Sequence, residues 1–118
     1  MGMYTEILVK CDIRTDILPS NRLALDYLFN RESDTLADKP GHPFFETHRW
    51  RMVGVGCSAH IAISVLSNNQ IFSHSELKNH NEVDLFFDWL RPLTDACDGD
   101  CIGWHWYDEC AAPTLVLK

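Results

Sequence analysis

Hydrophobic and polar residues alternate at the start of the chain in a pattern typical of a β-strand. In residues 4–13, "YTEILVKCDI", Thr, Ile, Val, Cys and Ile occupy one phase of the alternation, and Tyr, Glu, Leu, Lys and Asp occupy the other. Because successive side chains of a strand point to opposite faces, this segment is predicted to be a strand with one buried face. Residues 19–30 then carry Leu23, Tyr27 and Leu28 at helical spacing behind Pro19 and Ser20, which predicts a short helix.

Three further strands are predicted in the middle of the chain. Residues 31–43 are polar and rich in proline near their end, so we expect a loop there. Residues 49–56, "RWRMVGVG", have the pattern of a strand interrupted by glycines, and residues 60–68 have that of a second strand. Asn68 and Asn69 form the expected turn into a third strand at 71–79.

A second helix and two more strands complete the pattern. Residues 82–91 place Val83, Phe86, Phe87 and Leu90 on one apolar stripe, with Asn81 as the expected N-cap and Pro92 ending the helix. Residues 102–109 and 113–118 are predicted to be strands. The order is therefore β-α-β-β-β-α-β-β, in one domain spanning 1–118.

Short connections between successive strands favour antiparallel pairing. Two amphipathic helices can cover only one face of such a sheet. The sequence therefore predicts an α+β two-layer sandwich: a mainly antiparallel sheet of about five to six strands, with both helices on one face.

Composition narrows the classes of partner. The 118 residues include 17 acidic and 10 basic side chains, which give a formal charge of −7. We therefore expect no direct binding to nucleic acid and none to an anionic membrane, since both need a basic surface. No apolar run approaches the length of a membrane span.

Cysteine usage indicates a reducing compartment. Five cysteines cannot all pair within one chain, and residues 1–10 lack the charged and apolar regions of a signal peptide. We expect a cytoplasmic protein with free thiols.

The segment "CDGDCIGWHWYDEC", residues 97–110, concentrates candidate metal ligands. Cys97, Cys101, His105 and Cys110 are ligand types that zinc prefers. However, residues four apart on a strand lie about 13 Å from each other, so Cys101 and His105 are not expected to share one ion. A zinc site remains an alternative if Cys97 and Cys101 are joined by Cys57 or His60.

Other catalytic signals are weaker. Asp98 and Gly99 have the pattern of a tight turn rather than a calcium loop. Cys57 and His60 would make a thiol nucleophile only with a base and a third group positioned by the fold. No glycine-rich phosphate loop is present. We expect no cofactor and assign no catalytic residue.

Aromatic residues mark the strongest candidate for binding. On the strand at 102–109, Trp104 and Trp106 share one face, and His105 and Tyr107 share the other. One of these faces must point away from the helices unless the protein oligomerises. Since exposed aromatics often anchor protein interfaces, we expect contacts from this strand and from the adjoining Asp108 and Glu109.

Several segments together resemble a known group of proteins. They are "MYTEILVK", "HPFFETHRW", "IFSHSELKN", "FFDWLRPL" and "IGWHWYDECAAPTLVLK". They are similar to a family of small proteins from phages, prophages and other bacterial mobile elements. The resemblance covers most of the chain and implies a setting, the cytoplasm of a bacterial host, rather than a reaction.

Three functional hypotheses follow. The first is a non-enzymatic binding protein, a homo-oligomer that engages a host protein and inhibits a host defence. The second is a binder of a small anionic ligand such as a nucleotide, using Arg49, Arg51 and His48, with both arginines on one strand face. The third is an enzyme or zinc protein that uses the cysteine and histidine set.

Overall fold

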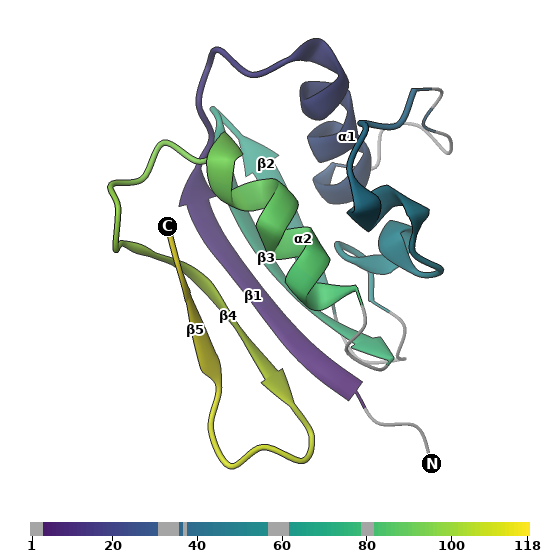
Figure 1. Cartoon of the computed structure of the whole chain (residues 1–118), viewed down its shortest axis with the longest axis vertical. Coiled ribbons are helices and arrows are strands. Elements are labelled where there is room, and N and C mark those ends of the chain that lie inside the picture. The colour runs from purple at the N-terminus through teal and green to yellow at the C-terminus, as the bar shows by residue number, and fades with distance from the viewer. Residues whose placement is uncertain (1–3, 31–35, 37, 57–61, 79–81) are drawn as a thin grey trace.

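The computed structural model describes residues 4–30, 36, 38–56, 62–78 and 82–118. It contains five strands and two α-helices (Figure 1). Their bounds, in chain order, are β1 (Tyr4–Asp12), α1 (Pro19–Phe29), β2 (Ile63–Ser67), β3 (Gln70–Lys78), α2 (Val83–Leu90), β4 (Cys101–Tyr107) and β5 (Thr114–Leu117). Three short 3₁₀ helices accompany them: η1 (Pro43–Glu46), η2 (Trp50–Met52) and η3 (Arg91–Leu93).

The five strands form one antiparallel sheet in the order β2-β3-β1-β4-β5. The first strand of the chain is therefore the central one, paired with β3 on one side and β4 on the other. Both helices lie on the same side of the sheet, with α2 crossing β1 and β3 (Figure 1). The predicted α+β fold with a helical layer on one face is confirmed, with five strands.

Alternation along β1 decides which face the helices cover. Thr5, Ile7 and Val9 are almost completely buried, whereas Glu6 and Leu8 between them are partly exposed. The helices bury their matching sides, including the whole predicted stripe of α2. In α1, Tyr27 and Leu28 are buried as expected, but Leu23 is exposed.

Residues 49–56 are not a strand, which corrects the expectation from the sequence. They form η2 and a turn that ends at Gly56, whose φ is +78°. The buried hydrophobic side chains here are those of Trp50 and Val53, which are three positions apart. This is the spacing of a helical turn, whereas a strand buries residues two apart.

An aromatic cluster fills the core between the 3₁₀ helices and α2. Phe44 is completely buried, and its ring centre lies 4.9 Å from that of Phe45, 5.4 Å from Phe86 and 5.9 Å from Trp89. The predicted loop therefore ends in a structured segment. His42 is the N-cap of η1, and its Nδ1 accepts a hydrogen bond from the Phe44 amide at 3.1 Å.

The predicted tight turns are confirmed where the structure describes them. Asn68 and Asn69, between β2 and β3, both have positive φ, which a two-residue hairpin of this twist requires. Gly99, in the turn before β4, has φ +90°. The expected helix cap Asn81 lies outside the described residues. Within the described chain, no helix has the length and apolarity needed to cross a membrane.

Candidate functional site: the open face of the sheet

The face of the sheet opposite the helices, here called the open face, carries most of the exposed hydrophobic side chains. It consists of the strand residues whose side chains alternate with the buried ones. Nine large hydrophobic residues in the described chain are exposed, and six of them lie on this face. The six, with their exposed fractions, are Ile63 (50%), Val65 (49%), Phe72 (42%), Trp106 (38%), Leu115 (60%) and Leu117 (47%).

Trp104 and Trp106 lie on the open face, on β4, which is the strand between β1 and β5. Their ring centres are 6.5 Å apart, and the Trp104 ring lies 6.1 Å from that of His74 on β3. The indole Nε1 of Trp106 donates a hydrogen bond to the Cys110 carbonyl at 2.9 Å. This bond holds Trp106 in place, so a partner would meet an aromatic surface that is already ordered.

Charged groups lie among these hydrophobic residues. His74 Nε2 forms a hydrogen bond with Glu6 Oε1 across the β1–β3 pair. Lys10 is exposed two residues beyond Leu8 on β1, and Lys78 and Glu76 belong to the same face of β3. Hydrophobic residues therefore extend across the open face from β2 to β5, and charged residues lie toward the two ends of the central strands.

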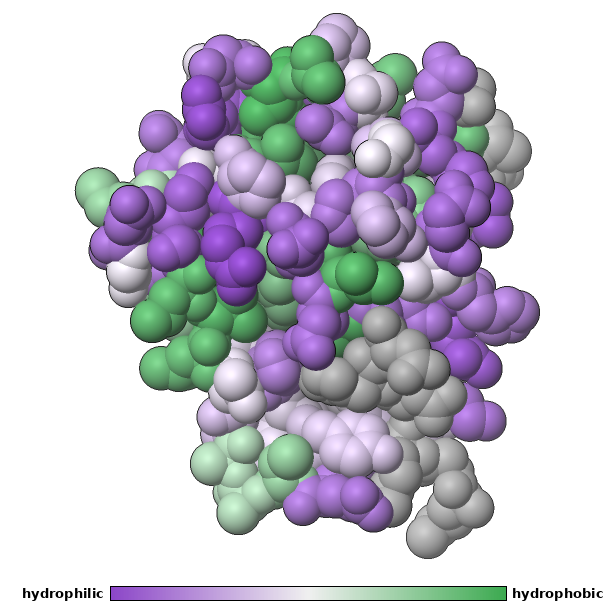
Figure 2. Space-filling model, in the orientation of Figure 1, coloured by the Kyte–Doolittle hydropathy of each residue, from purple (hydrophilic) through white to green (hydrophobic). Residues whose placement is uncertain are grey.

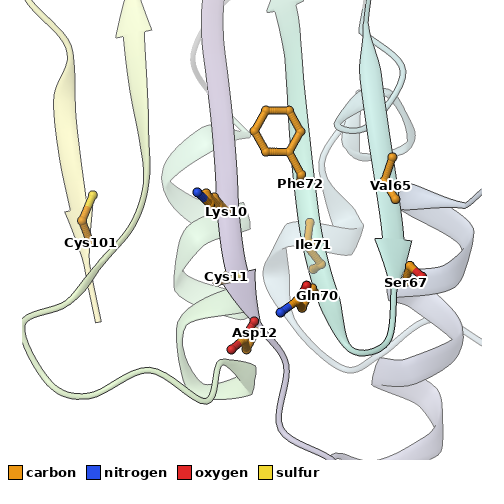
Figure 3. Close-up of a pocket in the computed structure, with 9 residues that line it drawn as sticks. All are labelled: Lys10, Cys11, Asp12, Val65, Ser67, Gln70, Ile71, Phe72 and Cys101. Atoms are coloured by element: carbon orange, nitrogen blue, oxygen red, sulfur yellow. The ribbon is translucent and has the colours of Figure 1, made fainter.

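A hollow of about 560 Å³ lies at the end of the open face near the β2–β3 turn. Figure 3 views it with the helices behind the sheet, and Lys10, Phe72 and Val65 surround it. Asp12 lies at its lower end in this view, and Cys101 lies to the left of Lys10. Its lining combines an aromatic ring, an aliphatic side chain and a lysine amine.

The helical side of the molecule has a different surface. In Figure 2, most of the surface of the described residues is hydrophilic, and the hydrophobic residues form separate groups. The three exposed hydrophobic residues outside the open face are Leu18, Leu23 and Val55. Leu18 is the N-cap of α1, Leu23 lies within α1 and Val55 follows η2, so none of the three belongs to a strand.

The contact residues expected on and after β4 do not lie on one surface, because they are divided between the two faces of the sheet and the turn that follows β4. The predicted opposition of the two faces is confirmed, because His105 packs beside Phe87 of α2, with ring centres 6.1 Å apart. Tyr107 is on this same helical side. Asp108 holds the start of β1, since its carboxylate accepts a hydrogen bond from the Tyr4 amide at 2.8 Å. Glu109 is exposed in the turn that follows.

The arginines expected to bind an anion do not share a strand face, because their segment is a 3₁₀ turn. Arg51 lies over the Trp50 ring, 4.8 Å from its centre. The Arg49 amide donates a hydrogen bond to the buried carboxylate of Glu82 at 3.2 Å. Neither arginine, nor His48, lines the hollow on the open face.

The cysteine and histidine set is only partly described. Cys97, Cys101 and Cys110 are exposed and unpaired by disulfides, and Cys101 and His105 lie four residues apart on β4, as expected. Cys57 and His60 lie outside the described residues. Among the residues that are described, no group of three or more His, Cys, Asp or Glu side chains is arranged to hold a metal ion.

Cys11 is a partly buried cysteine of β1 whose pKa is shifted by its surroundings. Its side chain points to the helical side of β1, and burial raises the pKa of the thiol to about 12, with the Asp12 carboxylate adding to the effect. A thiol with this pKa is almost entirely protonated at neutral pH, so Cys11 is not a prepared nucleophile.

Comparison with known proteins adds no relative. A scan against family models gave no match, and neither curated proteins nor solved structures gave one.

Sequence reasoning found the tryptophans but missed most of the apolar open face. The sequence did not single out the other exposed hydrophobic residues of this face, which are Ile63, Val65, Phe72, Leu115 and Leu117. The signal was present in the second phase of each alternation: in β2 and β5 the phase that faces away from the core is also hydrophobic. Hydrophobic residues in both phases of the alternation are typical of a strand that is buried on both faces.

Proposed function

We propose that the protein is a non-enzymatic binding protein that holds a protein partner on the open face of its sheet. One observation carries this proposal: among the residues that the structure describes, two-thirds of the exposed large hydrophobic ones lie together on the sheet face that the helices leave uncovered. Apolar surface gathered in this way, with charges at its margin, is typical of interaction sites.

The width of the apolar surface favours a macromolecular partner over a small ligand. Exposed hydrophobic residues occur on both edge strands, β2 and β5, and on two of the strands between them. Four strand spacings of about 4.8 Å separate the edges by roughly 19 Å. A nucleotide in the hollow would leave the β5 side uncovered, whereas a protein surface can span the whole sheet.

The energy available is substantial at each position. Covering a fully exposed leucine or phenylalanine contributes about 1.5–3 kcal/mol. The six residues retain from 38% to 60% of their exposure, so each contributes about 1 kcal/mol when a partner covers it. Trp104 adds a further large ring beside Trp106, and the hydrogen bond from Trp106 to the Cys110 carbonyl leaves Trp106 little conformational entropy to lose.

The phage setting belongs to this proposal as a further expectation. In that setting the protein also engages a host protein and thereby inhibits a host defence. The resemblance noted in the sequence supports this idea, and it remains a prediction.

Photo-crosslinking tests the binding surface directly. A benzoylphenylalanine is incorporated at position 115 or 65 on the open face, or at position 23 on α1 as a control. Leu115 and Leu23 are 60% and 53% exposed, so the two leucine positions are matched in accessibility. We expect covalent adducts in cells from positions 115 and 65 only. Equal yields at position 23, or no adduct from either open-face position, would contradict the proposal.

A further inference from the structure

We propose that the partner on the open face is a second copy of this chain, packed sheet on sheet about a two-fold axis. This inference rests on the proposed function of that face. It comes from the strand registers and from the placement of two opposite charges on β1.

The registers align one residue from each strand in a straight line across the sheet, here called the cross-strand row. Leu8 is opposite His74 on one side and Trp104 on the other, and these in turn are opposite residues of the two edge strands. In order across the sheet, the row is Ile63, His74, Leu8, Trp104 and Leu115. Apart from His74, every member is hydrophobic.

Charges on β1 lie symmetrically about this row. Glu6 is two residues before Leu8, and Lys10 is two residues after it, on the same face. They are about 13 Å apart along the strand, too far for an ion pair within the chain. A two-fold axis along the cross-strand row reverses the direction of β1 in the second copy. Glu6 of each copy then faces Lys10 of the other, which forms two equivalent ion pairs.

The same axis places the cross-strand row of one copy opposite the cross-strand row of the other copy. Leu8 packs on Leu8, Trp104 on Trp104 and Leu115 on Leu115, so the apolar part of each face meets apolar surface. Lys10 at the rim of the hollow also comes opposite the end of the sheet that carries Glu76. A surface that complements itself in this way is what a two-fold dimer requires.

Net charge also favours self-association through this face rather than another. The open-face strand residues include Glu6, Asp12 and Glu76 against Lys10 and Lys78, a formal charge of −1, while the chain as a whole carries −7. Most of the negative charge therefore lies elsewhere, where it opposes other contacts between two copies. Five strands of these lengths present roughly 500 Å² in projection, before the relief of the side chains is counted, against the ~800 Å² per partner of a standard interface.

Charge reversal at positions 6 and 10 tests the arrangement. The mass in solution is measured over a range of protein concentrations, and the wild-type chain of 13.6 kDa is expected at twice that mass. Glu6→Lys places two lysines together at each contact, and Lys10→Glu places two carboxylates together. Each single variant should weaken the dimer by at least about tenfold, and the double variant should recover most of the loss. Recovery is specific to a contact between chains, because the two positions do not meet within one chain.

Two controls separate this effect from a general loss of charge or fold. Lys78→Glu makes the same chemical change on the same face, but the axis places position 78 opposite Gln70, so its dimer constant should stay within about twofold. Leu115→Asp, on a 60% exposed residue, should give a folded monomer with an unchanged circular dichroism spectrum.

A wild-type chain that stays monomeric through the micromolar range would overturn the proposed dimer. A double variant no tighter than the single variants would overturn the two-fold arrangement. Adducts from the photo-crosslinking experiment separate the two proposals: an open-face adduct of twice the chain mass supports both. An open-face adduct of any other mass supports the binding surface and refutes the second copy.

Discussion

Phe44 is the residue whose removal should most damage the fold, and it lies in a segment with no strand or α-helix. It belongs to η1 and has no exposed surface. The substitution Phe44→Ala removes the ring from the centre of the aromatic cluster, between η2 and α2. The remaining rings are large and rigid, so they cannot close fully around the space it leaves.

The magnitude follows from burial. Removing a buried phenylalanine ring costs about 3–5 kcal/mol, including the cavity that is left. A chain of 118 residues at about 0.05–0.15 kcal/mol per residue has a free energy of unfolding of roughly 6–18 kcal/mol. At about 3–6 °C per kcal/mol for this size, Phe44→Ala should lower Tm by roughly 9–30 °C.

Urea denaturation followed by circular dichroism measures the loss at one fixed protein concentration, so that any dimerisation contributes equally. Leu23→Ala is the matched control, because Leu23 is 53% exposed on α1 and its truncation should change stability by less than about 0.5 kcal/mol. Phe44→Leu should fall between the two. If Phe44→Ala lost less than about 1 kcal/mol, the packing of η1 against α2 described above would be refuted.

Two more predictions concern β1. Gly103→Ala should cost about 3 kcal/mol or more in urea denaturation, because a Cβ there would lie 2.2 Å from the Leu8 carbonyl oxygen and force β1 and β4 apart; wild-type stability would contradict this close approach. Cys11 should react with iodoacetamide more slowly than the exposed cysteines at pH 8.5, as peptide mass mapping would show. Because burial raises its pKa from 9.0 to about 12, the unfolded chain loses this proton first, so stability should fall from about pH 9 toward pH 12. Cys11→Ala should reduce that fall, and an unchanged pH profile would count against the buried thiol.

Periodicity predicted the strands well where one phase of the alternation is buried and the pairing is regular. β1 follows this rule, and β4 follows it from Gly103 onward, after an irregularity in its pairing with β5 between Cys101 and Gly103. The opposite placement of Trp104 and His105 was predictable for the same reason. The hairpin at Asn68 and Asn69 was predictable because few residues adopt positive φ without strain.

The segment from His42 to Gly56 was not predictable in the same way. Its residues include Trp50, Met52 and Val53, which have strand-like composition, and two glycines that break any clear period. Tertiary packing decides the outcome here, because the aromatic cluster selects a turn that buries Trp50 and Val53 together. The cross-strand row was equally hidden, since register joins residues as distant in sequence as Leu8 and Leu115.

The central position of β1 also sets the order in which the chain can fold during synthesis. Its two neighbours come much later, since β3 begins at Gln70 and β4 at Cys101. At about 5–20 residues per second, the ribosome needs roughly 4–18 s to proceed from the end of β1 to the start of β4. Throughout that interval one edge of β1 has no strand to pair with, and its alternating apolar face is open to other chains. A chaperone that recognises extended apolar segments would therefore find a binding site in β1 before either neighbouring strand has been synthesised.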